Sequence, residues 1–242
     1  MQPDSLSEVQ TIVPHHALAS AHGKHDMVNG KHPDITQRGR LAFFLEFLRY
    51  PLQIGSVTPS SRFLEQRLMK TADISSAPTI VELGPGTGGT TRAILRAMSP
   101  QARLLCIEIN PHFYRLIGGI GDRRLTVHLG NACDLRQILD HYGLGAPDVI
   151  ISGIPFSTMS RHTGSEILAT ISAQLAPNGR FVAYQASDRV SDLCQPYLGT
   201  GRMEVELLNI PPMRVFRWEK ADTRTDARAV PDGQQREEES CP

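Results

Sequence analysis

The stretch that most constrains this fold is residues 79–91, T-I-V-E-L-G-P-G-T-G-G-T-T. It begins with β-forming residues and passes through closely spaced glycines into T-R-A-I-L-R-A-M, where Ile94, Leu95 and Met98 follow helical spacing. Glycine is favoured where the backbone needs positive φ or where a ligand lies against it, and the N–H groups that open a helix attract anionic groups. We therefore expect a strand, a glycine loop and a helix that bind a nucleotide-like ligand.

The residues around the glycines narrow the class of ligand. Gly84, Gly86 and Gly89 satisfy G-x-G-x-x-G, the dinucleotide fingerprint, and Glu108 lies 24 residues after Gly84. Glu82, however, stands two residues before the first glycine. A carboxylate there suits a cationic amino-acid ligand and repels a pyrophosphate. A nicotinamide site and a glycine turn that serves only packing remain the alternatives.

Composition limits the class of protein. The chain has 242 residues, 40% of them hydrophobic, which is enough for one α/β domain. Basic and acidic residues number 25 each, so no global field recruits nucleic acid. The 4 cysteines are scattered without C-x-x-C spacing, which is typical of reduced cytosolic thiols. No apolar run approaches ~20 residues and no signal peptide is evident, so we expect a cytoplasmic protein, soluble or peripheral on the inner membrane face.

The two ends of the chain differ in character from its middle. Residues 1–36 are polar and predict a disordered extension, and residues 221–242 are charged, lack aromatic residues and predict a disordered tail. The extension carries histidines without a regular ligand spacing, so no metal site is predicted: His15, His16, His22, His25 and His32. Residues 37–220 are expected to form the single folded domain.

Two front helices are predicted within residues 38–70. The first, at 38–50, has an apolar stripe formed by Leu41, Phe44, Leu45 and Leu48. Its basic residues Arg38, Arg40 and Arg49 make it either an anchor on an anionic membrane surface or a helix packed on the domain's own sheet. The second helix is capped by Ser60 or Ser61 and is expected to turn four apolar residues inward: Phe63, Leu64, Leu68 and Met69.

Further strand patterns alternate with helices along the rest of the chain. They end at Glu108, at Asn131, at Ser152 and at Gln185, and two final strands flank Pro211 and Pro212. Helices are predicted after Pro111, at 166–175 and at 190–198. The alternation predicts an α/β fold with a Rossmann-like, doubly wound, seven-stranded sheet. Ligands of such sheets bind at the carboxyl ends of the strands, so residues 152–156 are expected to face the reacting groups.

Six motifs together carry a family resemblance: I-G-S-V-T-P-S-S-R-F-L, V-E-L-G-P-G-T-G, I-E-I-N-P-H-F, G-N-A, I-I-S-G-I-P-F and L-N-I-P-P-M-R-V-F. Over roughly residues 41–218 the chain resembles class I S-adenosylmethionine-dependent methyltransferases. It looks most like the bacterial phospholipid N-methyltransferases that act on phosphatidylethanolamine. It is similar, more distantly, to the ribosomal RNA adenine dimethylases, whose motif after the fourth strand is commonly N-L-P-Y.

The resemblance implies S-adenosyl-L-methionine as cofactor. In the family the glycine loop lies against the methionyl part, the acid matched by Glu108 binds the ribose hydroxyls, and a side chain at the place of Asn131, usually Asp, binds the adenine amine. The expected cofactor-binding residues are Ser56, Ser60, Glu82, Gly84, Pro85, Gly86, Thr87, Gly88, Glu108, Ile109, Asn131, Ala132 and Ser152.

The expected acceptor loop consists of Gly153, Ile154, Pro155 and Phe156. A sulfonium is an activated methyl donor, so placing a neutral amine in line supplies much of the acceleration. An ammonium headgroup must first lose its proton, for which His162 and Tyr184 are candidate bases, each with a structural role as the alternative. The resemblance implies methylation of a phospholipid amine at an anionic membrane surface.

Other functions remain open at this point. The neutral net charge, and Ser152 where adenine dimethylases carry Asn, argue against nucleic acid. The alternatives are a methyltransferase for a soluble small molecule, a protein or an RNA adenine, and a cofactor-binding module without catalysis.

Overall fold

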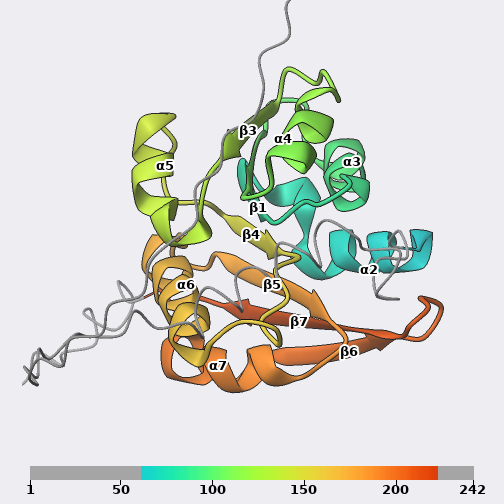
Figure 1. Cartoon of the computed structure of the whole chain (residues 1–242), viewed down its shortest axis with the longest axis vertical. Helices are drawn as coiled ribbons and strands as arrows, with labels where there is room; N and C mark the ends of the chain where they lie inside the picture. Colours follow the sequence, from blue (N-terminus) through green and yellow to red (C-terminus); the bar gives the residue numbers. More distant parts are fainter. Residues whose placement is uncertain (1–60, 223–242) are drawn as a thin grey trace, which may run out of the picture. The chain divides into compact units, whose positions relative to one another are not determined.

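A computed structural model describes residues 61–222 (Figure 1). They form the predicted α/β fold, a single sheet of seven strands in the order β3-β2-β1-β4-β5-β7-β6. The strands are β1 (Thr79–Leu83), β2 (Arg103–Glu108), β3 (Leu125–Leu129), β4 (Val149–Ser152), β5 (Arg180–Gln185), β6 (Arg202–Glu206) and β7 (Met213–Glu219). The helices are α2 (Arg62–Ala72), α3 (Gly89–Ala97), α4 (Pro111–Gly118), α5 (Leu135–His141), α6 (Arg161–Gln174) and α7 (Arg189–Leu198), with short 3-10 turns η1 (Ile74–Ser76) and η2 (Ala132–Asp134).

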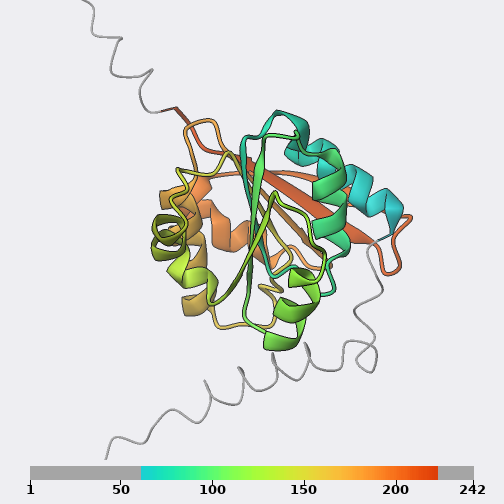
Figure 2. The same cartoon turned by 90° about the horizontal axis from the view of Figure 1, so that it is seen from above.

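Helices cover both faces of the sheet, as Figure 2 shows, with α2, α3 and α4 on one side and α5, α6 and α7 on the other. Neighbouring residues of β1 serve opposite faces, because side chains alternate along a strand. Ile80 packs with the α2–α4 layer and Val81 with the α5–α7 layer. Both are fully buried. Burial on both faces explains why the central strands read as continuous apolar runs in the sequence.

The strand register brings several loops to one edge of the sheet. Strands β1 to β5 pair in parallel, and Leu83 lies opposite both Ile107 and Ser152. Strand β7 is antiparallel to β5, with Arg214 opposite Gln185, and β6 is antiparallel to β7. The β6–β7 turn therefore lies at the edge where β1, β2 and β4 end. We call this the carboxyl edge.

Helix ends follow the capping residues in the sequence. The Ser61 side chain accepts a hydrogen bond from the Leu64 N–H and caps α2, and Asn110 caps α4 ahead of Pro111. Leu64 and Leu68 are buried as predicted, whereas Phe63 was wrongly predicted to point inward. Its side chain is 37% exposed and lies beneath the Arg62 guanidinium, 5.0 Å from the ring centre.

Several predictions fall on residues outside 61–222. They are the disordered extension, the front helix at 38–50, the cofactor residues Ser56 and Ser60, and all but the first two residues of the predicted tail. The domain limits therefore stay predictions. Within the described stretch, no helix is long and apolar enough to cross a membrane. The same stretch contains no cluster of His, Cys, Asp and Glu that would hold a metal ion.

Candidate cofactor and acceptor site

The glycine loop joins β1 to α3 at the carboxyl edge. Gly84, Gly86 and Gly88 have φ values of 70°, 57° and 82°, a region that L side chains rarely adopt. A Cβ on Gly86 would meet no heavy atom within 4 Å, so the backbone there faces open space. A Cβ on Gly88 would instead lie 2.6 Å from Ile117 Cδ1. One glycine leaves room for a ligand and the other lets α3 approach α4.

Glu108 ends β2 and is 1% exposed. Its Oε2 accepts a hydrogen bond from the Gly86 N–H at 3.1 Å, and its Oε1 accepts one from the Asn110 N–H at 2.8 Å. Burial raises the pKa of Glu108, while these backbone donors act against that rise. Backbone donors from Asn110, Gly86 and Ile109 leave about one of the four acceptor sites of the carboxylate for a ligand. Glu108 thus fixes the glycine loop and can still accept a hydrogen bond from a ligand hydroxyl.

Glu82 lies beneath the glycine loop and is also 1% exposed. Its Oε2 accepts hydrogen bonds from the Thr91 hydroxyl at 2.6 Å and from the Cys106 thiol at 3.2 Å. Its Oε1 is buried and has no hydrogen-bond partner among the described residues. Burial raises the pKa of Glu82 to about 7. An unsatisfied buried carboxylate oxygen is unfavourable alone, and a cationic ligand group beside it fits this site.

The predicted adenine side of the site lies where β3 ends. Asn131 caps η2, and its Oδ1 accepts a hydrogen bond from the Cys133 N–H at 3.0 Å. Asn131 is exposed, and Ala132 beside it is buried. The same amide oxygen keeps one lone pair and the amide nitrogen keeps its two N–H donors for a ligand. The remaining predicted residues lie in or near these loops, with Pro85 buried, Thr87 exposed and Ile109 half-buried.

The acceptor loop follows β4, next to the glycine loop. Ser152 is fully buried, and its hydroxyl accepts a hydrogen bond from the Ile154 N–H at 3.2 Å. Ile154 is 9% exposed, and the Phe156 ring is fully buried in the α5–α7 layer of the core. The Phe156 ring therefore packs beneath the loop and does not face the site, which leaves residues 153–155 as the part of the loop expected to face the reacting groups.

The backbone of the acceptor loop is largely saturated. The Ile154 carbonyl accepts hydrogen bonds from the Phe156 N–H at 3.0 Å and from Gln185 Nε2 at 2.8 Å. The Pro155 carbonyl accepts two from Thr158, one from its N–H and one from its hydroxyl. Within residues 61–222, no such donor is found for the Gly153 carbonyl. Of the three carbonyls, that of Gly153 is the one that keeps both lone pairs for a ligand.

Comparison with known proteins now decides the family. The chain is 31% identical over 144 residues to the ornithine lipid N-methyltransferase of Singulisphaera acidiphila, a match that covers 57% of this chain and 75% of that protein. The chain belongs to the S-adenosylmethionine-dependent methyltransferases. Its cofactor is S-adenosylmethionine. No protein-family model matches the chain.

Other matches to the methyltransferase are shorter or structural. It is 28% identical over 95 residues to the ribosomal RNA small subunit methyltransferase A of Caulobacter vibrioides, which is 38% of this chain and 34% of that protein. The N-methyltransferase NodS of Bradyrhizobium japonicum, solved with S-adenosyl-L-homocysteine, superposes with a TM-score of 0.56 at 13% identity, over 78% of this chain and 100% of that one. TrmN of Thermus thermophilus superposes with a TM-score of 0.55 at 19% identity, over 72% of this chain and 52% of that one. These structures share the fold.

The two candidate bases of the methyltransferase differ in their surroundings. The Tyr184 hydroxyl lies 3.2 Å from the Thr90 hydroxyl, and burial raises the pKa of Tyr184 to about 12. The His162 side chain is 77% exposed on α6, where its Nδ1 lies 3.2 Å from Glu166 Oε2. The role of base stays a prediction for both residues, and the raised pKa of Tyr184 favours its structural alternative.

Tyr184 has a packing role that the sequence did not reveal. A Cβ on Gly153 would lie 2.6 Å from Tyr184 Oη and 2.9 Å from the Gly84 carbonyl oxygen. The glycine loop, the acceptor loop and the tyrosine thus meet at Gly153. Tyr184 stands one residue before the end of β5, at the carboxyl edge, and that position is the one sequence signal that pointed to it.

Proposed function

We propose that this methyltransferase methylates the amine headgroup of a phosphatidylethanolamine-type phospholipid at a membrane surface. The observation that carries the proposal is the match to a lipid N-methyltransferase over 75% of that protein's length. The S-G-I-P-F and L-N-I-P-P-M motifs, which resemble those of the phospholipid enzymes, support the same class of acceptor.

The proposed cofactor site is formed by the loops after β1, β2 and β3. S-adenosylmethionine bound there supplies an activated methyl group. The backbone at Gly86 leaves open space for the ligand. The buried Oε1 of Glu82 accepts no hydrogen bond within the described residues and can accept one from the cationic amine of the cofactor. Glu108 offers its remaining acceptor capacity to the ribose hydroxyls. Asn131 serves the adenine amine through its amide oxygen. We propose that the remaining residues predicted from the sequence to bind the cofactor also belong to this site, including Ser56 and Ser60, which lie outside the described residues.

The acceptor loop is proposed to position the amine without forming a bond to it. The Gly153 carbonyl orients the headgroup nitrogen by accepting one of its N–H donors, while the closed turn of Ile154 and Pro155 keeps that carbonyl in place. Phe156 anchors the turn in the core. Holding a neutral amine in line with a methyl donor is worth several orders of magnitude in rate, and the ammonium headgroup loses its proton to water before it attacks.

The test is methyl transfer from radiolabelled S-adenosylmethionine by the full-length protein. Matched vesicles contain phosphatidylethanolamine, ornithine lipid or phosphatidylcholine, and separate reactions contain small-subunit ribosomal RNA or soluble ethanolamine. We expect label in the phosphatidylethanolamine fraction after chromatography. Label in ornithine lipid alone would correct the headgroup, and label in RNA or soluble amine alone would overturn the lipid proposal. At S-adenosylmethionine concentrations well below saturation, a Glu108→Ala variant controls for transfer that does not depend on the cofactor site.

A further inference from the structure

The turn between β6 and β7 presents apolar side chains to solvent. It spans residues 207–212, and Leu207, Leu208 and Ile210 are 71%, 62% and 78% exposed. Pro211 and Pro212 beside them are exposed as well. These five residues form the hairpin tip. They lie at the carboxyl edge, because β7 begins opposite the end of β5.

Polar groups hold the hairpin tip in this orientation. Asn209 lies in the same turn, yet it is only 4% exposed. Its Oδ1 accepts a hydrogen bond from the Ser61 N–H at 2.9 Å, and its Nδ2 donates one to the Pro211 carbonyl at 2.8 Å. Glu206 Oε1 accepts another from the Leu208 N–H at 3.0 Å. The usual arrangement is inverted, since polar side chains fasten the turn from inside and apolar side chains point outward.

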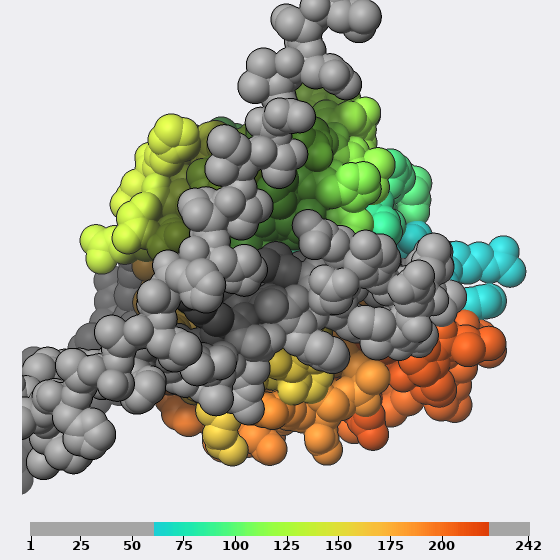
Figure 3. Space-filling view, in the orientation of Figure 1, coloured from blue at the N-terminus to red at the C-terminus, as the bar shows by residue number. Residues whose placement is uncertain are grey.

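Basic side chains lie along α2 and the hairpin, with Arg62 and Arg214 next to the tip and Arg202 and Arg217 at the far end of the hairpin. Figure 3 shows α2 and the hairpin as neighbouring surfaces at the right of the molecule, and a groove of about 510 Å³ lies between them. Helix α2 and the hairpin together carry six cations against three carboxylates over residues 62–70 and 202–217. The cations are Arg62, Arg67, Lys70, Arg202, Arg214 and Arg217.

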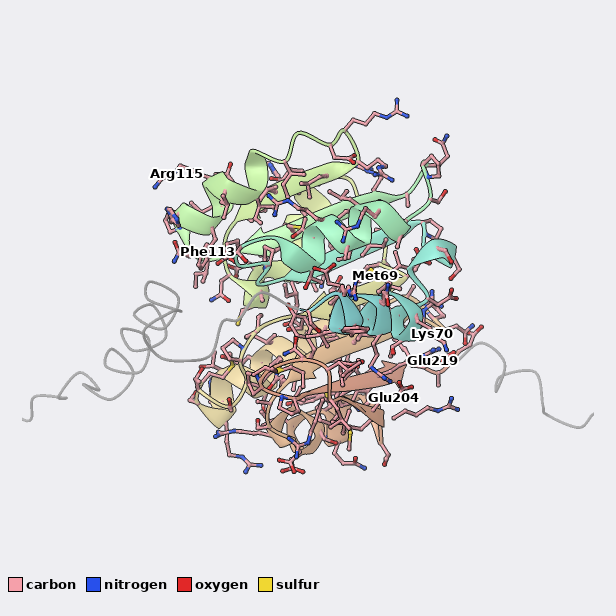
Figure 4. All side chains as sticks on the ribbon, turned by 90° about the vertical axis from the view of Figure 1, so that its right-hand side faces the viewer. Met69, Lys70, Phe113, Arg115, Glu204 and Glu219 are labelled. Atoms are coloured by element: carbon pink, nitrogen blue, oxygen red, sulfur yellow. The ribbon has the colours of Figure 1, made fainter. Side chains whose placement is uncertain are left out.

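The carboxylates of this surface are already paired within the protein. Arg67 lies 2.7 Å from Glu206 and 2.5 Å from Glu204, and Glu65 lies 2.9 Å from Arg96. Figure 4 shows Lys70 on α2 and Glu204 on β6, across the groove from each other. Arg67 and Arg217 are themselves used in ion pairs with Glu204, Glu206 and Glu219, so the net positive charge that a partner meets near the tip comes mainly from Arg62 and Arg214. Exposed leucine and isoleucine with flanking arginine and lysine are typical of surfaces that enter the headgroup region of an anionic bilayer.

We propose that the hairpin tip docks on an anionic phospholipid bilayer. Leu207, Leu208 and Ile210 enter the boundary between headgroups and acyl chains, and Arg62 and Arg214, the cations next to the tip, stay at the phosphate level. The acceptor loop lies at the same edge of the sheet, so docking turns the site toward the lipid surface. This orientation rests on the proposed function, whereas binding by the tip does not.

The single tryptophan of the chain allows a test that is specific for the tip. Trp218 is 2% exposed, so it does not report on a bilayer surface. A Leu208→Trp variant of the full chain is mixed with vesicles of phosphatidylglycerol and phosphatidylcholine that carry brominated acyl chains. We expect its fluorescence to be quenched at least twofold, while wild type and Leu116→Trp are not quenched. Leu116 on α4 is 43% exposed and is the matched control. Unquenched Leu208→Trp on protein that sediments with the vesicles would overturn the proposal.

A second variant tests the contribution of the tip to binding. Leu207→Ser/Leu208→Ser/Ile210→Ser is expected to bind anionic vesicles at least tenfold more weakly than wild type, while Leu116→Ser binds normally. Cofactor affinity and thermal unfolding of the triple variant are expected to match wild type. Vesicle binding equal to wild type would overturn the proposal. So would a wild-type dimer that the triple variant dissociates, because the tip would then be an interface between copies.

Methyl transfer separates this inference from the proposed function. If the wild type methylates lipid, the triple variant should lose transfer to vesicles and keep transfer to detergent-dispersed lipid. If the wild type methylates no lipid but Leu208→Trp is quenched, the proposed function fails and the docking surface stands. Loss of transfer to both lipid forms, with intact cofactor binding, would place the tip in the acceptor site and overturn its docking role.

Discussion

The glycine loop and the acceptor loop leave adjacent strands at the same edge of the sheet, yet they differ in what they offer a ligand. The glycine loop has open backbone at Gly86 and an unsatisfied oxygen of Glu82 beneath it. In the acceptor loop, two carbonyls are saturated by the turn itself and the Phe156 ring is buried.

This difference indicates that the glycine loop provides affinity for the cofactor and that the acceptor loop positions the amine. A loop with unsatisfied groups can gain affinity from a ligand, because the ligand supplies the missing partners. A saturated loop gains little affinity and serves as a fixed surface against which an amine is held. We expect substitutions near the glycine loop to change cofactor binding and substitutions in the acceptor loop to change turnover.

The largest expected effect is that of Gly153→Ala, where the two loops meet. The added Cβ would lie 2.6 Å from Tyr184 Oη and 2.9 Å from the Gly84 carbonyl oxygen, so the loops must separate. A misplacement of ~1 Å at a reacting group lowers turnover about 100-fold. Overpacking of this kind lowers the free energy of unfolding by about 1–3 kcal/mol. Tyr184→Phe in the same chain removes the closest contact and should restore part of both losses. Steady-state kinetics and thermal unfolding measure them, and failure of the second substitution to rescue either would show that Tyr184 is not the obstacle.

Glu108→Gln tests the glycine-loop side of the comparison. The amide keeps an oxygen acceptor but loses the charge, so S-adenosylmethionine should bind about 10-fold more weakly, and Glu108→Ala about 10–100-fold more weakly. Calorimetric titration gives both affinities. Turnover at saturating cofactor should change much less than affinity in the Gln variant. Unchanged affinity in a folded Glu108→Ala protein would remove Glu108 from the site.

The Glu82 carboxyl makes stability depend on pH. Burial raises its pKa from the ordinary 4.5 to about 7, so the folded state binds this proton more tightly than the unfolded state. The contribution is fully present below about pH 4.5 and is lost as pH rises through 7, a loss of about 3 kcal/mol in the cofactor-free protein. Urea unfolding at pH 5 and pH 8 should show this decrease in wild type and not in Glu82→Gln. Equal pH dependence in both proteins would exclude Glu82 as its source.

Cofactor binding should act on the same carboxyl in the opposite direction. A cationic amine beside Glu82 favours the ionised form, so affinity for S-adenosylmethionine should rise about 10-fold between pH 6 and pH 8 in excess of the rise in Glu82→Gln. Titration of the ligand itself is common to both proteins and cancels in the comparison. Calorimetry in buffers of different ionisation enthalpy should detect a proton released on binding only in the wild type.

The smallest expected effect is that of His162→Ala. The side chain is exposed and faces Glu166 one turn along α6, so turnover and its pH profile should stay within twofold of wild type. A lost acidic limb in the pH profile would return His162 to the role of base and would contradict a fixed acceptor surface.

The sequence predicts the sheet well because its signals are local. Buried runs such as 103–108, the helix start near Pro111, and the alternation around Pro211 depend on neighbouring residues, and the structure confirms the seven strands that they imply. Phe63 was wrongly predicted to be buried, because helical spacing identifies a face and does not show how far that face is covered.

The site was less predictable because its features depend on distant partners. The positions of Glu82 and Glu108 follow from the motif, but the unsatisfied oxygen of Glu82 depends on Thr91 and Cys106, and the saturation of Ile154 depends on Gln185. The exposed hairpin tip likewise depends on the bond between Asn209 and Ser61, 148 residues apart. No spacing pattern reports such contacts.

The buried thiol of Cys106 has a kinetic consequence. It is inaccessible on β2, it donates a hydrogen bond to Glu82, and burial raises its pKa well above the ordinary value. Alkylating reagents attack thiolates, so they can reach this sulfur only during moments when β1 and β2 part. Burial also raises the pKa of the Cys133 thiol at η2, but this cysteine is only half-buried and is reached without strand opening. The lag between alkylation of the two cysteines therefore measures how often the floor of the glycine loop opens, and cofactor should lengthen that lag by the factor 1 + L/Kd, where L is the free cofactor concentration.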